Sequence, residues 1–109
     1  MEDDVIFANA VAFHAQQAVE KCLKAFLTSR QVHFPKTHDL GSLQELVETV
    51  DNNLAGSLDN VEALTPFGVE TRYPADRPDA TPDEAKRFAA IARSVSERVS
   101  ASLPASFTG

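Results

Sequence analysis

Three groups of polar residues have the types and spacing to bind an anion or a nucleotide. Lys36 and His38 follow Pro35 at the expected start of a helix, where free backbone N–H groups beside a lysine favour an anion. Arg72 and Tyr73 adjoin in a Pro-rich stretch, and a guanidinium next to an aromatic ring suits a phosphate and a base. The third group shares one ridge of a helix, because its members recur at three- and four-residue steps: His14, Gln17 and Lys21.

We hypothesise that the three groups line one cleft, although each group also has a purely structural interpretation. His14 and Gln17 could only tie a long helix to a crossing loop by hydrogen bonds. His38 could be no more than the neighbour of a helix cap, since Asp is a common capping residue and Asp39 follows it. Tyr73 could simply pin its loop to the domain. Both interpretations stay open, because sequence spacing does not show whether the groups converge.

Other kinds of site lack support in the sequence. It contains no Gly-rich phosphate loop, no Cys/His spacing typical of a metal site and no nucleophile with an adjacent base. We therefore expect neither a metal nor a cofactor. The single cysteine, Cys22, excludes a disulfide within the chain, and its place on an apolar helix face predicts a buried, unreactive thiol.

Composition is typical of an ordinary globular domain. The 109 residues, 43% hydrophobic and 24% charged, suffice for one core, so we expect a single domain over 1–109 with a core over 5–103 and a frayed tail at 104–109. No apolar run is long enough for a membrane span, and a cytoplasmic location is expected. A net charge of −6 argues against extended DNA binding, although a small basic patch at 20–38 precedes an acidic stretch at 39–70.

A long helix over Val5–Arg30 is the element that the other segments are expected to cover, since it contains neither Gly nor Pro. Its buried face is predicted to comprise Phe7, Ala8, Val11, Ala12, Ala15, Ala18, Val19, Cys22, Leu23 and Phe26. The polar side is predicted to comprise Gln16, Gln17, Glu20, Lys21 and Lys24, with Ile6, Ala10 and Phe13 intruding on it near the N-terminus.

Shorter helices complete the predicted fold. Thr37 or Asp39 caps a second helix, in which Leu and Val recur at helical spacing up to Val50. A weaker third helix is predicted over 54–64, followed by a Pro-rich loop over 66–82. Thr81 and the residues after it form the clearest start signal, for a last helix that ends near Leu103. These elements predict an all-α, up-and-down antiparallel bundle.

Three motifs in order carry a family resemblance: FHAQQAVEKCLKAFL at 13–27, PKTHDL at 35–40 and LTPFGVETRYP at 64–74. Together they resemble the HEPN domain, a helical module of higher eukaryotes and prokaryotes, over roughly residues 10–103. The resemblance implies a helical bundle that is usually dimeric and often made beside a minimal nucleotidyltransferase. It also implies nucleotide binding, and many members of the family that this chain resembles are ribonucleases that act as toxins or in RNA defence.

The chain departs from the family pattern in two respects. Ribonuclease members have an Arg followed four to six residues later by a His, whereas here Arg30 precedes His33 by three and His38 by eight residues. From the resemblance we also expect the helix that usually comes first to be missing or shortened, which would leave Ile6, Ala10 and Phe13 without cover. Because exposed apolar area costs about 25 cal/mol per Å², we expect a homodimer over this surface, or else a start codon further upstream.

The favoured function is a non-catalytic HEPN-like module of a toxin–antitoxin type that binds a nucleotide or an RNA end and partners a nucleotidyltransferase. Lys36, His38, Arg72 and Tyr73 are its predicted phosphate and base contacts, with His14, Gln17 and Lys21 lining the same cleft. One alternative is a ribonuclease toxin in which His38 is the general base and Arg72 clamps the phosphate. Another is a purely structural helical module that only holds a partner.

Overall fold

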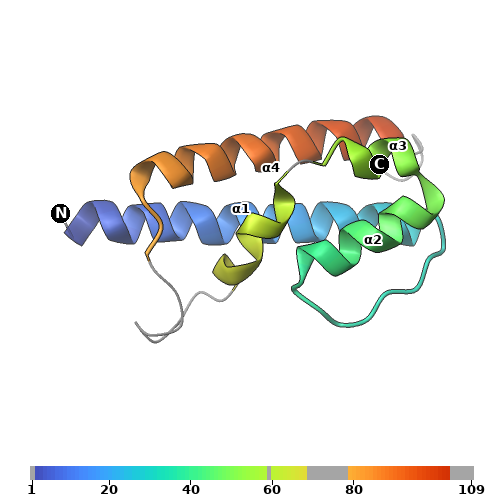
Figure 1. Ribbon diagram of the computed structural model, residues 1–109, viewed down its shortest axis with the longest axis horizontal. Helices are drawn as coiled ribbons and strands as arrows, with labels where there is room; N and C mark the ends of the chain where they lie inside the picture. The colour runs from blue at the N-terminus through green and yellow to red at the C-terminus, as the bar shows by residue number, and fades with distance from the viewer. Residues whose placement is uncertain (1, 59, 69–78, 104–109) are drawn as a thin grey trace.

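The computed structural model describes residues 2–58, 60–68 and 79–103, which form helices and connecting turns without a strand. The helices are α1 Glu2–Ser29, α2 Leu40–Val50, α3 Asn52–Gly56, the 3-10 helix η1 Val61–Phe67 and α4 Pro82–Ser102. The predicted all-α bundle is therefore confirmed. The antiparallel arrangement is wrong for α1 and α4, which run side by side in the same direction (Figure 1). Asn9 near the start of α1 accepts from Ala80 N just before α4, and Arg30 after α1 donates to Ser102 O at the end of α4. Within these residues no helix is both long and apolar enough to cross a lipid bilayer.

Helix α1 sets the length of the molecule. Its 28 residues span about 42 Å at 1.5 Å per residue, close to the longest extent of 44 Å. Helix α4 lies along α1, while α2 and η1 pack across another side of it (Figure 1). The core forms where these segments meet, and its largest fully buried apolar side chains are Phe26, Leu23, Leu27, Leu40, Leu43, Leu58 and Leu64.

Local signals explain where α2 and α4 begin and where α1 ends. Asp39 caps α2 by accepting a hydrogen bond from Gly41 N. Thr81 and Glu84 form a reciprocal capping box at the start of α4, as predicted. Helix α1 ends where Gln31 adopts a left-handed φ of 59° and Val32 N donates to Leu27 O over 2.9 Å. This reversal sends the connector at 30–39 back along α1.

The single helix predicted over 54–64 is wrong. The structure has two short elements there, α3 and η1, and Asn60 between them adopts a left-handed φ of 64°. Asn accepts this conformation at lower cost than most residues, so the chain turns at this point instead of continuing a helix. Ser57 assists by donating its hydroxyl to Leu54 O at the end of α3.

The buried side of α1 differs from the predicted face. Phe7 is 70% exposed and Ala18 is also exposed, whereas Gln16 (0%) and Glu20 (6%), which were predicted on the polar side, are buried. The reason is that α2 and η1 pack on the side of α1 that carries Gln16 and Glu20. A helical wheel locates an apolar stripe but cannot show which polar residues another segment covers.

Cys22 is half-buried on α1 instead of fully buried. Burial raises the pKa of its thiol, and a hydrogen bond with Ser96 of α4 offsets only part of that rise. The protonated thiol is therefore favoured at neutral pH, which agrees with the unreactive role predicted for it.

Candidate functional site

The main polar site of the described residues lies where the connector at 30–39 returns to α1. Two turns of α1 supply most of its side chains, and these lie together because residues four apart on a helix share one side. The connector then adds a histidine from outside the helix. We call the five side chains the Gln16 cluster: Gln16, Gln17, Glu20, Lys24 and His38.

Gln16 is the centre of this cluster. Its Nε2 donates to Glu20 Oε1 and to the backbone oxygen of His38, both over 3.1 Å. Its Oε1 accepts from Gln17 Nε2 over 2.8 Å. Since Gln16 is completely buried, these partners satisfy an amide that water does not reach. The amide thereby fixes the connector to α1.

Glu20 is a buried carboxylate with three hydrogen-bond donors. Oε1 accepts from Gln16 and contacts His38 Nδ1 at 2.8 Å, and Oε2 accepts from Lys24 Nζ at 3.0 Å. Burial by itself raises the pKa of Glu20, but the hydrogen bonds from His38, Lys24 and Gln16 together outweigh it and lower the pKa below its usual value. Glu20 is therefore ionised at neutral pH, and Lys24 balances its charge.

His38 has one anchored and one accessible nitrogen. An ionised carboxylate only accepts hydrogen bonds, so the contact with Glu20 places a proton on Nδ1 and leaves Nε2 for other partners. The His38 side chain is 65% exposed, whereas that of Glu20 is 8% exposed. The pair thus presents an oriented imidazole at the surface and keeps its carboxylate inside.

The anion site expected from free N–H groups at the start of α2 is already filled by the protein. Leu40 N donates to the Thr65 hydroxyl over 3.1 Å, and Gly41 N donates to Asp39 Oδ1 over 3.0 Å. The Asp39 carboxylate would also repel an anion at this position. Any anion bound here would depend on the side chains of Lys36 and His38.

The segment 69–78 lies outside the described residues, but both of its flanks are fixed to α1. Gly68 approaches Gln16 so closely that a Cβ on it would lie 3.0 Å from Gln16 Nε2. On the other flank, Asn9 donates to Asp79 Oδ1 over 3.1 Å and accepts from Ala80 N over 2.9 Å. Gly68 and Asp79, the described residues on either side of 69–78 in the sequence, therefore both lie against the helix that carries the Gln16 cluster.

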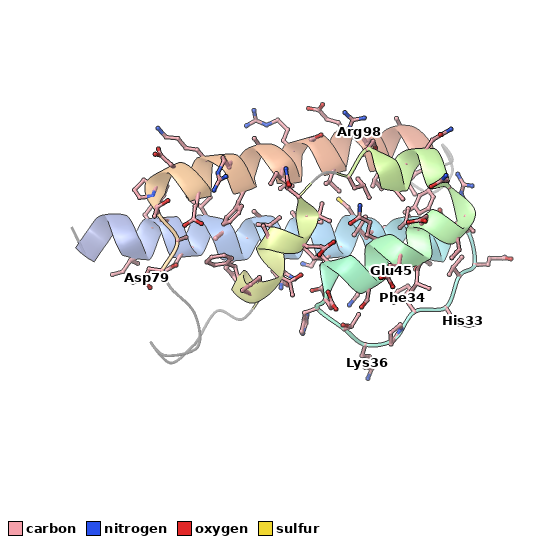
Figure 2. All side chains as sticks on the ribbon, in the orientation of Figure 1. His33, Phe34, Lys36, Glu45, Asp79 and Arg98 are labelled. Atoms are coloured by element: carbon pink, nitrogen blue, oxygen red, sulfur yellow. The ribbon has the colours of Figure 1, made fainter. Side chains whose placement is uncertain are left out.

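The structure brings together only some of the residues predicted from the sequence. Gln17 and His38 belong to the Gln16 cluster, and Lys36 is exposed on the connector with its side chain directed away from the helices (Figure 2). His14 and Lys21 are exposed on α1. The ring of His14 contacts Phe13 at a centroid distance of 5.4 Å. Arg72 and Tyr73 lie outside the described residues.

Sequence reasoning missed the residues that join the segments. The predicted ties between helix and loop were His14 and Gln17, but the structure uses Gln16 and Asn9. The spacing of Gln16, Glu20 and Lys24 could have indicated this role. They recur every four residues, so each side chain can form a hydrogen bond with the next one along the helix.

Gly68→Ala should lower the free energy of unfolding by about 1–3 kcal/mol, because the new methyl group would press on a buried amide held by three partners. Gly56→Ala is the matched control, since nothing lies within 4 Å of a Cβ there. Its expected effect is a gain of about 0.5 kcal/mol from reduced freedom of the unfolded chain. Urea unfolding followed by circular dichroism measures both, and equal values for the two variants would contradict the close contact.

Stability should fall in acid because of Glu20. Its folded-state pKa lies below the usual value of about 4.3, so its stabilisation is complete above that value and is lost as the pH falls through the folded-state pKa. Glu20→Gln should flatten the acid side of the stability profile. Glu45→Gln, at an exposed carboxylate of α2 (Figure 2), should leave it steep. Identical profiles for Glu20→Gln and the unmodified chain would refute this assignment.

The described residues contain no group of three side chains suited to hold a metal ion.

Comparison with known proteins gives one match. The sequence pattern of the family described as HEPN domain covers residues 3–102. No curated protein and no solved structure matches the chain.

Proposed function

Because the chain belongs to the HEPN domain family, we propose that it is a non-catalytic module that binds a nucleotide or an RNA end beside the Gln16 cluster. Family membership makes it a nucleotide- or RNA-related helical module. The ligand, its contacts and the lack of catalysis are our proposals.

One observation carries this proposal: Gln16 contacts both segments that hold the candidate ligand residues. It donates to the backbone oxygen of His38 and lies against Gly68. Lys36 precedes His38 by two residues and Arg72 follows Gly68 by four. We propose that Lys36 and Arg72 bind one ligand at the surface of the cluster.

The proposed contacts divide between phosphate and base. Lys36 and Arg72 would bind phosphate oxygens, because charge-assisted hydrogen bonds favour such groups. His38 Nε2 would bind a phosphate or sugar oxygen, and Tyr73 would stack on the base. The ridge of α1 beside them, His14, Gln17 and Lys21, would line the cleft. Lys24 does not contribute positive charge to it, since Glu20 neutralises that ammonium.

Isothermal titration calorimetry with ribonucleotides tests this proposal. Lys36→Ala and Arg72→Ala should each weaken binding by about ten- to a hundredfold, because loss of one charged hydrogen bond costs about 1.5–3 kcal/mol. Arg93→Ala is the control, since it removes an exposed cation of α4 that lies outside the cluster. No heat with any ribonucleotide, or equal weakening by the control, would refute the pocket.

We also propose that the chain forms a homodimer through the exposed α1 surface, made of the exposed Ile6, Phe7 and Ala10 and the half-buried Phe13. Ile6 is 62% and Phe7 is 70% exposed, and these are the most exposed large apolar residues of the described chain. Two cavities adjoin them, one of about 300 Å³ beside Phe7 and one of about 260 Å³ beside Ile6 and Phe13. A second copy would remove this surface from water.

The proposed protein partner is a minimal nucleotidyltransferase, in a toxin–antitoxin pair. Its support is the family alone, since genes for the two proteins often occur together in that family. Co-purification from cells that express both would test this partner, and separate elution of the two proteins at micromolar concentration would count against it.

A ribonuclease toxin is the second candidate, and the contact between Glu20 and His38 favours it. A carboxylate that holds Nδ1–H leaves Nε2 oriented to accept a proton from an RNA 2′-hydroxyl. Expression should then arrest growth, and His38→Ala should abolish the arrest. Arrest that survives His38→Ala would exclude this role for the histidine.

A further inference from the structure

A groove on the flank of α4 shares no lining residue with the Gln16 cluster or with the exposed α1 surface. It consists of two cavities, of about 430 Å³ and about 240 Å³, between α4 and the segment 57–67. Both cavities are lined by Asn60, Ala90 and Ile91, so they form one continuous depression. The turn at Asn60 opens it, because α3 and η1 diverge at that left-handed residue.

The two ends of this groove carry guanidinium groups. Arg87 lines the larger cavity and Arg98 the smaller one. Eleven residues of α-helix separate them by about 16 Å and about three turns, which places both on one side of α4. Figure 2 labels Arg98 on α4 near α3, and Ser57 and Leu58 after α3 line the same cavity.

Neither arginine is neutralised by an acid within the described residues. Arg98 Nε donates to Ser94 over 3.2 Å, which leaves its terminal nitrogens available. Glu84, the acid that lines the groove near Arg87, accepts from Thr81 N in the capping box instead. The lining between the two cations is mixed. Phe67 and Phe88, in ring contact at 5.2 Å, line the larger cavity, whereas the smaller one is lined by Ser57, Asn60 and Ser94 beside Leu58, Ile91 and Val95.

We propose that this groove binds an acidic amphipathic helix of a partner protein. The side of α4 that borders the groove carries Arg87, Ile91, Ser94 and Arg98, which are spaced four, three and four residues apart. A helix that packs against this side presents its own residues at the same spacing. The complementary helix carries acids at positions i and i+11 and apolar residues at i+4 and i+7. The acids pair with the arginines, and the apolar side chains fill the two cavities.

The shape and chemistry of the groove favour a helix over single-stranded RNA. Bases need exposed aromatic faces on which to stack, but Phe67 is 7% and Phe88 is 3% exposed. The apolar part of the lining that a ligand meets is aliphatic or small, from residues such as Ile91, Ala90 and Ala63, with Asn60 and Ser94 as neutral polar residues beside it. Such a surface accepts Leu or Val side chains from a partner helix.

The test uses a fluorescein-labelled peptide of about 18 residues, or about five helical turns, with Glu at i and i+11, Leu at i+4 and i+7, and Ala, Gln and Ser elsewhere. Anisotropy titration with the full chain should show binding. Arg87→Glu combined with Arg98→Glu should weaken it by at least about tenfold. Ala90→Trp, at an exposed position that lines both cavities, should weaken it similarly while thermal melting stays unchanged.

Arg93→Glu, which reverses a cation of α4 outside the groove, is the control and should leave peptide binding intact. The proposal is overturned if the chain does not bind the peptide, if a peptide with Lys in place of both Glu binds equally well, or if Ala90→Trp has no effect. Displacement of the peptide by a uridine RNA would assign the groove to nucleic acid and overturn it too. Ala90→Trp should leave ribonucleotide binding unchanged, because Ala90 lies outside the Gln16 cluster. A loss of peptide binding alone therefore concerns this groove and not the proposed nucleotide site.

Discussion

Gln16→Leu should lower the free energy of unfolding by about 2–4 kcal/mol, although leucine and glutamine have similar volumes. The leucine cannot donate to Glu20 or to the backbone of His38, and cannot accept from Gln17. A buried group that loses its partner costs about 1–3 kcal/mol, and more when it is charged. Glu20 is both buried and charged and would lose one of its three donors, so its carboxylate contributes to the expected loss together with the backbone oxygen of His38.

Gln17→Leu is the matched control for this prediction. Gln17 is the next residue of α1, but it is only half-buried and makes one hydrogen bond within the cluster. Its expected cost is about 0.5–1 kcal/mol, the net value of an ordinary hydrogen bond. Urea unfolding followed by circular dichroism measures both variants. A cost for Gln16→Leu no larger than that of Gln17→Leu would show that Gln16 is not the centre of the cluster.

Gln16→Leu should also weaken ribonucleotide binding, because the connector at His38 and the chain at Gly68 both contact this amide. The binding loss should appear under conditions in which the variant is still folded, as a calorimetric titration at low temperature can show. Unchanged affinity in the folded variant would mean that Gln16 stabilises the fold without positioning the ligand residues.

Phe26→Ala is the second change with a large expected effect, a loss of about 3–5 kcal/mol in the free energy of unfolding. The Phe26 ring is fully buried, and the Arg30 guanidinium lies 4.9 Å from its centroid. Removing the ring leaves a cavity and deprives that cation of a partner. Phe7→Ala removes the same side chain from the same helix at a position that is 70% exposed.

The two phenylalanine variants separate folding from assembly. Phe7→Ala should change the unfolding of a monomer by less than about 0.5 kcal/mol, but it should weaken the proposed dimer in sedimentation equilibrium. Phe26→Ala should lower stability at every protein concentration. A stable monomer of the unmodified chain at high concentration would contradict the dimer, and equal destabilisation by both variants would contradict the burial of Phe26.

Several elements of this fold could be predicted from local sequence because local physical chemistry decides them. The start of α4 follows from Thr81 and Glu84, whose side chains satisfy the first backbone N–H groups without help from other segments. The cap of α2 at Asp39 has the same cause. The helical character of α1 follows from an uninterrupted run of helix-forming residues. The family resemblance likewise rested on the motifs, and the match over 3–102 confirms it.

Tertiary structure decided which polar residues of these helices are buried and which of them pair. Gln16 and Glu20 are polar, and a wheel places them opposite the apolar stripe, yet α2 and η1 bury them against α1. His38 became part of a site because Gln31 turns the connector back along α1, over a sequence separation of 18 residues from Glu20. The physical reason is that periodicity and capping are local, whereas the burial and pairing of a polar group depend on which distant segment covers it.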